Sequence, residues 1–150
     1  MKRIVCFVLL VLIVWGTIPL CGFADETDME TIYFDDDSYI MIEISQPMGR
    51  ASGSITGSKN YTYYDSNGSS QWKAVLTGSF TYTGTSATCT SSNVSVTIYD
   101  STWSVNSKSA SKNENTATAY VQMVQKALGL TVKTVPVNMT LPCDANGNLS

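Results

Sequence analysis

The feature that most constrains this chain is an unbroken two-residue alternation from Gln71 to Gly84, QWKAVLTGSFTYTG. One parity is apolar or small and runs from Trp72 to Tyr82, whereas the other is mostly polar and holds Lys73, Val75, Thr77, Ser79 and Thr81. A period of two is that of a β-strand, because successive side chains point to opposite faces of the sheet. We therefore expect a central strand here, onto which the remaining strands add.

Other segments show similar β character, and Gly, Pro, Asn and Asp separate them. Residues 108–115 are expected to be a polar loop. The pattern predicts an all-β chain that forms a single antiparallel β-sandwich of about seven to nine strands, immunoglobulin-like in architecture with its topology left open. The expected strands besides the central one are 39–44, 51–59 (short or at an edge), 86–90, 93–99, a short one from Trp103, 116–127 and 131–143.

The segment 116–128 fits two periods. As a strand, it aligns apolar residues at every second position from Ala117 to Met123. As a helix, it aligns Ala117 with Val121 and Leu128, and Gly129 would serve as a C-cap. The local threonines and the strand that follows favour the strand, but the sequence leaves both open.

The N-terminus has the organisation of a secretory signal peptide. Lys2 and Arg3 precede an apolar run, 4–15, and a small-x-small site ends at Ala24, just before Asp25. These are the charged, apolar and cleavage regions of such a peptide. We expect residues 1–24 to be removed between Ala24 and Asp25, which places the protein in the extracellular space or at the cell surface.

Two alternatives to cleavage were considered. A retained membrane anchor is disfavoured by Pro19 and the nearby glycines, although residues 4–24 are almost long enough to span a bilayer. Lipidation of Cys21 is disfavoured because Leu20, the residue before it, is large.

Charge limits the partners of the remaining 126 residues. They hold seven basic and twelve acidic side chains, and seven of the acids lie in 25–37. That run is too charged for a strand and is expected to be a partly disordered mature N-terminus, followed by a sandwich domain, 38–150. Without a basic patch, nucleic acid is not expected as a partner, and neither is stable membrane insertion after leader removal.

Two cysteines, Cys89 and Cys143, remain after the leader is removed. Each falls on the expected inward face of a strand, and the predicted compartment is oxidising. We therefore expect a Cys89–Cys143 disulfide, with a pair of buried thiols as the alternative.

Catalytic chemistry has little support. The chain has no histidine, which removes Ser-His and Cys-His nucleophiles and His-ligated zinc. Paired carboxylates could still hydrolyse glycosides, yet most acids of the expected domain fall in turns. We expect no enzyme activity, no metal and no cofactor.

Aromatic residues are the better functional signal. Tyr61, Tyr63 and Tyr64 lie beside an Asn67–Gly68 turn. Exposed and coplanar, they would form a platform for sugar rings or a protein partner; ordinary packing is the alternative. The expectation is a secreted, non-enzymatic binding protein for an unknown extracellular protein or glycan, with a carbohydrate-binding module as the alternative and a glycosidase as a third possibility.

The stretch WKAVLTGSFTYTGTSATCT and the ending VNMTLPCDANGNLS resemble short, signal-bearing, β-rich proteins of Gram-positive bacteria. The resemblance covers about residues 72–150. It implies an extracellular β-rich protein and transfers no site residues, because that group is uncharacterised.

Overall fold

The computed structural model describes residues 29–46 and 53–150. Within these ranges every regular element is a strand, and no helix is long and apolar enough to cross a membrane. The predicted leader 1–24, including the cleavage site between Ala24 and Asp25 and the alternative lipidation site Cys21, lies outside the described residues.

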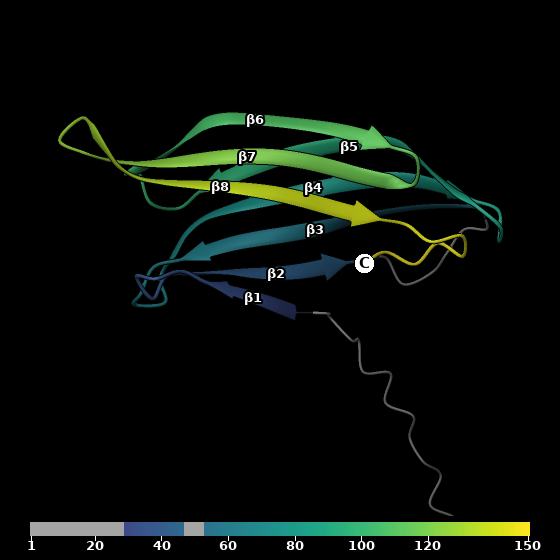
Figure 1. The fold of residues 1–150 in the computed structure, drawn as a ribbon, viewed down its shortest axis with the longest axis horizontal. Coiled ribbons are helices and arrows are strands. Elements are labelled where there is room, and N and C mark those ends of the chain that lie inside the picture. The colour runs from purple at the N-terminus through teal and green to yellow at the C-terminus, as the bar shows by residue number, and fades with distance from the viewer. Residues whose placement is uncertain (1–28, 47–52) are drawn as a thin grey trace, which may run out of the picture.

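The first five strands form one antiparallel sheet in sequence order, so that each strand pairs with the next (Figure 1). The predicted central strand is confirmed as β4, which pairs with β3 on one side and β5 on the other. The five strands are β1 (Met29–Tyr33), β2 (Tyr39–Ser45), β3 (Ser54–Tyr64), β4 (Ser70–Tyr82) and β5 (Ala87–Ile98).

The last three strands form a second antiparallel sheet, again in sequence order. They are β6 (Trp103–Asn113), β7 (Thr116–Ala127) and β8 (Leu130–Pro142). The chain passes from one sheet to the other through residues 99–102, where Asp100 accepts hydrogen bonds from the backbone N–H groups of Thr102 (2.8 Å) and Trp103 (3.1 Å). The predicted antiparallel sandwich is confirmed, with two consecutive meanders as its connectivity.

The core lies between the inner faces of the two sheets. Alternation places every second side chain of β4 in it, and Trp72, Ala74 and Leu76 are completely buried. Burial of a large apolar side chain contributes about 1.5–3 kcal/mol each. The facing sheet contributes the buried side chains of Ala117, Val121, Met123, Val135, Val137, Met139 and Leu141.

Small residues set the distance between the sheets where β4 crosses β7. A Cβ atom added to Gly78 would lie 2.7 Å from the Phe80 ring and 2.9 Å from the Cβ of Ala117. Neither contact is possible without movement of the neighbours. Gly78 therefore has a packing role that no larger residue could fill at this spacing.

The expectation that the acidic segment 25–37 contains no strand is wrong for 29–33, which is β1. All five residues of β1 are exposed, and it pairs only with β2. An edge strand tolerates charged side chains because one side of it stays in water.

Three other boundaries also differ from the prediction, the first being that the expected strands 86–90 and 93–99 form one continuous strand, β5. Of the expected short or edge strand 51–59, residues 51–52 lie outside the described residues, and 54–59 belong to β3, which is paired on both sides and is no edge. The expected loop 108–115 is mostly strand, because β6 continues to Asn113. By contrast, the strand interpretation of 116–127 is confirmed by β7.

The predicted Cys89–Cys143 disulfide is not formed; both residues are buried thiols. The Sγ of Cys89 donates to the Ser91 carbonyl (3.3 Å), and the Sγ of Cys143 donates to the Asp144 carbonyl (3.5 Å). Strand parity predicted that both side chains point inward, which is correct. Parity says nothing about the short Cα–Cα distance that a disulfide requires.

Candidate functional site

Four connections gather at one end of the sandwich, because in a meander every odd-to-even connection lies at the same end (Figure 1). We call it the loop end. It consists of residues 34–38, 65–69, 99–102 and 128–129.

The most densely bonded side chain at the loop end is Lys133 of β8. Its ammonium group donates to the carboxylate of Asp36, to the Oγ of Ser38 (3.0 Å) and to the hydroxyl of Tyr63 (2.5 Å). It also lies 5.7 Å from the ring centroid of Phe34 and 5.2 Å from that of Tyr63. These contacts join the three-stranded sheet to the β1–β2 connection.

The charges of this pair are mutually stabilised. The hydrogen bond from Lys133 lowers the pKa of Asp36 from 3.8 to about 2, and Ser38 adds a second hydrogen bond to the carboxylate. Burial pulls the pKa of Lys133 down, but its hydrogen bonds to Asp36 and Tyr63 outweigh burial and leave that pKa raised. Both groups therefore stay ionised at neutral pH.

A polar cavity of about 110 Å³ lies beside this pair, which is room for a few water molecules. The indole N–H of Trp103, a buried residue that lines the cavity, has no hydrogen-bond partner among the described residues. Besides Trp103, the lining consists of Asp36, Ser38, Tyr63, Asp65, Ser66, Gln71, Gln125 and Lys133. The cavity suits a small polar group better than an apolar one.

A row of tyrosines crosses the outer face of the five-stranded sheet at the loop end. Tyr33, Tyr39 and Tyr64 are successive cross-strand neighbours on β1, β2 and β3. The rings of Tyr39 and Tyr64 stack at 4.9 Å with 13° between their planes, and Tyr33 tilts against Tyr39 at 5.6 Å. Burial raises the pKa of Tyr64, with further contributions from Tyr39, Glu43 and the nearby Tyr99. We call Tyr33, Tyr39, Tyr64 and Tyr99 the tyrosine row.

The predicted platform of Tyr61, Tyr63 and Tyr64 is wrong as a set. Tyr61 and Tyr63 are only 5% and 2% exposed and point into the sandwich, whereas Tyr64 belongs to the outer face. Burial and the nearby Glu30 raise the pKa of Tyr61, despite its hydrogen bond with the Thr140 backbone. Parity could have separated these rings, because positions 61 and 63 share one face of a strand and 64 lies on the other.

The remaining members of the tyrosine row were not identified from the sequence. Tyr33 lies in a segment predicted to be disordered, and Tyr99 follows β5. Only the pairing of β1 with β2 and of β2 with β3 places Tyr33, Tyr39 and Tyr64 side by side.

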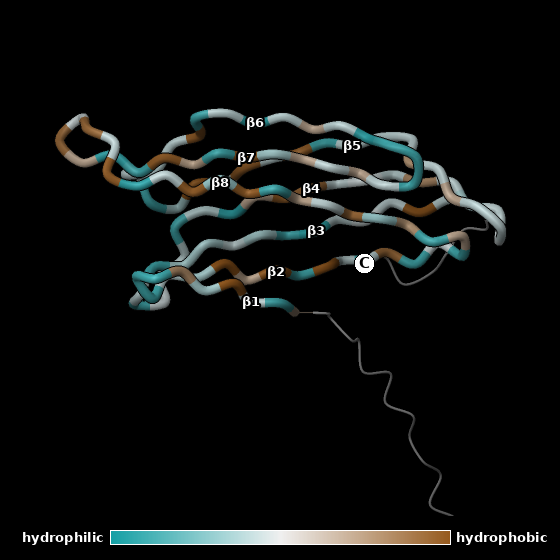
Figure 2. The backbone as a smooth tube through the Cα atoms, viewed as in Figure 1, coloured by the Kyte–Doolittle hydropathy of each residue, from teal (hydrophilic) through white to brown (hydrophobic). Residues whose placement is uncertain are grey.

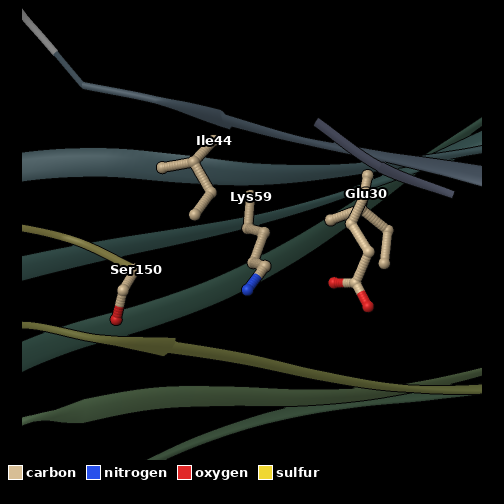
Figure 3. A pocket seen from close by; sticks show the side chains of 5 residues that line it. Glu30, Ile44, Lys59 and Ser150 are labelled. Atoms are coloured by element: carbon tan, nitrogen blue, oxygen red, sulfur yellow. The ribbon is translucent and has the colours of Figure 1, made fainter. Parts of the chain in front are cut away.

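A second recess, of about 290 Å³, lies along the inner face of β1–β3. Figure 3 shows Glu30, Ile44 and Lys59 pointing into it, with Ser150 at its margin; Ile42 completes the lining. It combines two isoleucines with one charge of each sign.

Carboxylates are used mainly for local structure. Asp65, Asp100 and Asp144 each accept backbone N–H bonds of 2.8–2.9 Å within their own turns, as the sequence predicted for turn residues. Asp36 and Asp65 line the same cavity, but the lowered pKa of Asp36 is the opposite of what a general acid needs. Within residues 29–46 and 53–150, no three or more His, Cys, Asp or Glu side chains are grouped so that they could hold a metal ion.

Comparisons with protein-family models, with curated proteins and with solved structures found no match. The geometry of the loop end is therefore the basis for a functional proposal.

Proposed function

We propose that this chain is an exported, non-enzymatic binding protein whose ligand is a glycan held across the tyrosine row. The observation that carries the proposal is the row itself, four phenol rings gathered on one outer face at one end of a sandwich. Tyrosine suits a sugar ligand because it offers an apolar ring and a hydroxyl group on a side chain with little rotational freedom.

The ends of the row carry most of the contact. Tyr39 and Tyr64 face each other, so part of their ring area is already used. Tyr33 and Tyr99 are more than half exposed. A chain of sugar units could lie against Tyr33 and Tyr99 and donate to the hydroxyl groups between them.

The environment favours binding over catalysis. The hydrogen bond from Lys133 keeps Asp36 ionised. Both carboxylate oxygens of Asp65 already accept hydrogen bonds, from the backbone of Asn67 and Ser69 and from the side chain of Gln71. Neither carboxyl is arranged to donate a proton to a leaving group. The signal peptide and the extracellular location belong to the same proposal and rest on the N-terminal sequence.

A glycan array tests the proposal, with wild-type protein compared with the double variant Tyr33→Ala/Tyr99→Ala. We expect loss of the bound glycans in the double variant, because each aromatic contact with a ligand contributes roughly 1–3 kcal/mol by analogy with stacked bases. Tyr120→Ala is the matched control, since Tyr120 lies on the outward parity of β7 in the other sheet. An array without any binding, or binding that the double variant retains, would refute the glycan proposal and leave a protein partner.

A further inference from the structure

The tip of the β7–β8 hairpin is the most exposed apolar segment of the described protein. Residues 126–132 are all exposed, and they include Ala127, Leu128, Leu130 and Val132. Leu128 is fully exposed, and Leu130 and Val132 are 71% and 60% exposed. Figure 2 shows this apolar tip extending beyond the other connections of the loop end.

The turn residue Leu128 has no evident role in folding. Leu128 and Gly129 have φ angles of 52° and 80°, the two positive values of a type I′ hairpin turn. Asparagine or glycine is the usual first residue of such a turn, because a branched apolar side chain is strained in the left-handed region. Leu128 is strained and fully exposed, so it departs from this turn preference without any gain in packing. Departures of this kind are expected at functional positions.

Charge is unevenly distributed over the two sheets. Residues 29–46 and 53–100 hold seven acids and two lysines, whereas residues 101–142 hold four lysines and one acid. The β7–β8 hairpin itself, 116–142, has Lys126 and Lys133 and no acid. Lys133 is paired with Asp36 at the base, which leaves the exposed Lys126 as the charge nearest the tip.

We propose that residues 126–132 insert into the interfacial layer of a lipid bilayer with anionic headgroups. Aliphatic side chains enter the acyl boundary, and Lys126 lies at the level of the headgroups, the arrangement by which peripheral elements bind membranes. A projecting, convex tip meets a flat bilayer without collision from the rest of the molecule. The energetic hot spots of protein interfaces, by contrast, are enriched in Trp, Tyr and Arg, whereas Leu and Val are under-represented there, and the tip has none of the three enriched types.

The contact is shallow and reversible. The connections 34–38, 65–69 and 99–102 do not extend as far as the tip in Figure 1, and each contains acidic residues, which anionic headgroups would repel. They stop a closer approach, so that only the tip enters the bilayer. This is compatible with an acidic chain overall, because the attraction is local to one hairpin.

Vesicle binding tests the proposal, using the chain recovered after secretion, with its N-terminus established by intact mass. Leu128→Trp supplies a probe at the tip, because Trp72 and Trp103 are buried and give a constant background. We expect its emission to shift to shorter wavelength with vesicles of mixed phosphatidylcholine and phosphatidylglycerol. An unchanged spectrum overturns the proposal.

Leu128→Asn separates binding from folding, because asparagine suits the turn. We expect vesicle affinity to fall about tenfold or more with the lost leucine, while thermal stability stays or rises. Lys126→Gln should weaken binding about fivefold to the vesicles that contain phosphatidylglycerol. It should not change binding to vesicles of phosphatidylcholine alone.

Met29→Asn is the matched control, since Met29 is also exposed but lies at the start of β1, away from the loop end. Its affinity should equal that of the wild type. Equal binding by wild type and Leu128→Asn overturns the proposal. So does a dimer in sedimentation velocity that Leu128→Asn abolishes without any vesicle effect, which would assign the tip to a second copy of the chain.

Discussion

Two hairpin turns at the loop end, β3–β4 and β7–β8, differ in how their residues satisfy the turn. In the β3–β4 turn, the Oδ1 of Asp65 accepts the N–H groups of Asn67 (2.9 Å) and Ser69 (2.8 Å), and its Oδ2 accepts the side chain of Gln71 (3.1 Å). Gly68 supplies the positive φ angle of that turn. The β7–β8 turn instead places Leu128 in a strained conformation with its side chain in water.

The residues of the β3–β4 turn stabilise the fold, whereas those of the β7–β8 turn suit the contact with a bilayer that we propose. In the β3–β4 turn, the Asp65 carboxylate accepts hydrogen bonds from backbone and side-chain groups nearby. The leucine of the β7–β8 turn accepts none, and the hairpin is instead held at its base by Lys133. Mutations at the two turns should therefore change stability in opposite directions.

The largest expected effect is at Asp65. Asp65→Ala removes the acceptor of three hydrogen bonds and should lower the free energy of unfolding by about 1–3 kcal/mol. Urea denaturation measures the change. Ser66→Ala, in the same exposed turn, should stay within about 0.5 kcal/mol of the wild type. Equal stability of Asp65→Ala and Ser66→Ala would show that the turn does not depend on its carboxylate.

A smaller effect of opposite sign is expected at Leu128. Leu128→Asn places a residue that tolerates the left-handed region at a position with φ of 52°. The free energy of unfolding should rise by about 0.5–1 kcal/mol.

Leu130→Asn is the control for Leu128→Asn, because Leu130 is also exposed but belongs to a strand, where asparagine is a poor choice. It should give no gain. If both variants gain equally, removal of exposed leucine would explain the effect, and the strain at Leu128 would not.

The smallest effect is expected at the ion pair of Lys133 and Asp36, which holds the base of the β7–β8 hairpin. The folded-state pKa of Asp36 is about 2, below its ordinary value of 3.8. Its contribution to stability is therefore present above pH 4 and is lost as the pH falls from about 4 to about 2. Lys133 has a raised pKa and keeps its charge throughout this window.

Urea midpoints measured across that pH window test this dependence. Asp36→Asn should remove part of the acid-induced loss of stability, whereas Asp35→Asn, at the neighbouring exposed position, should not. The same slope in wild type and Asp36→Asn would show that the pair contributes nothing to the acid response.

Strand periodicity was the most reliable guide to the fold. It predicted β4 with its inward Trp72, β7 over 116–127 and β8 to within one residue at each end. Buried faces follow from alternation because a one-residue shift would put every apolar side chain in water. The start of β6 at Trp103 was predicted, but its polar second half, 108–113, was taken for a loop, since Ser, Lys and Asn on an exposed strand look like a loop.

The candidate site was less accessible to sequence reasoning. Tyr64 was identified, but with two partners, Tyr61 and Tyr63, that are buried. The exposed apolar tip carries no motif, and its importance depends on exposure. Charge density misled the interpretation of β1, because an edge strand can keep charged side chains in water.

The sequence by itself determined that this chain is all-β, which segments form most of its strands and which side of β4 is buried. These properties are local, because alternation and turn residues act within a few positions along the chain. Only the tertiary structure decided which tyrosines share a surface, that Lys133 bonds Asp36 from the opposite sheet, and that Cys89 and Cys143 form no disulfide with each other. Those relations join residues distant in sequence, and their distances depend on how the strands pair and how the two sheets pack.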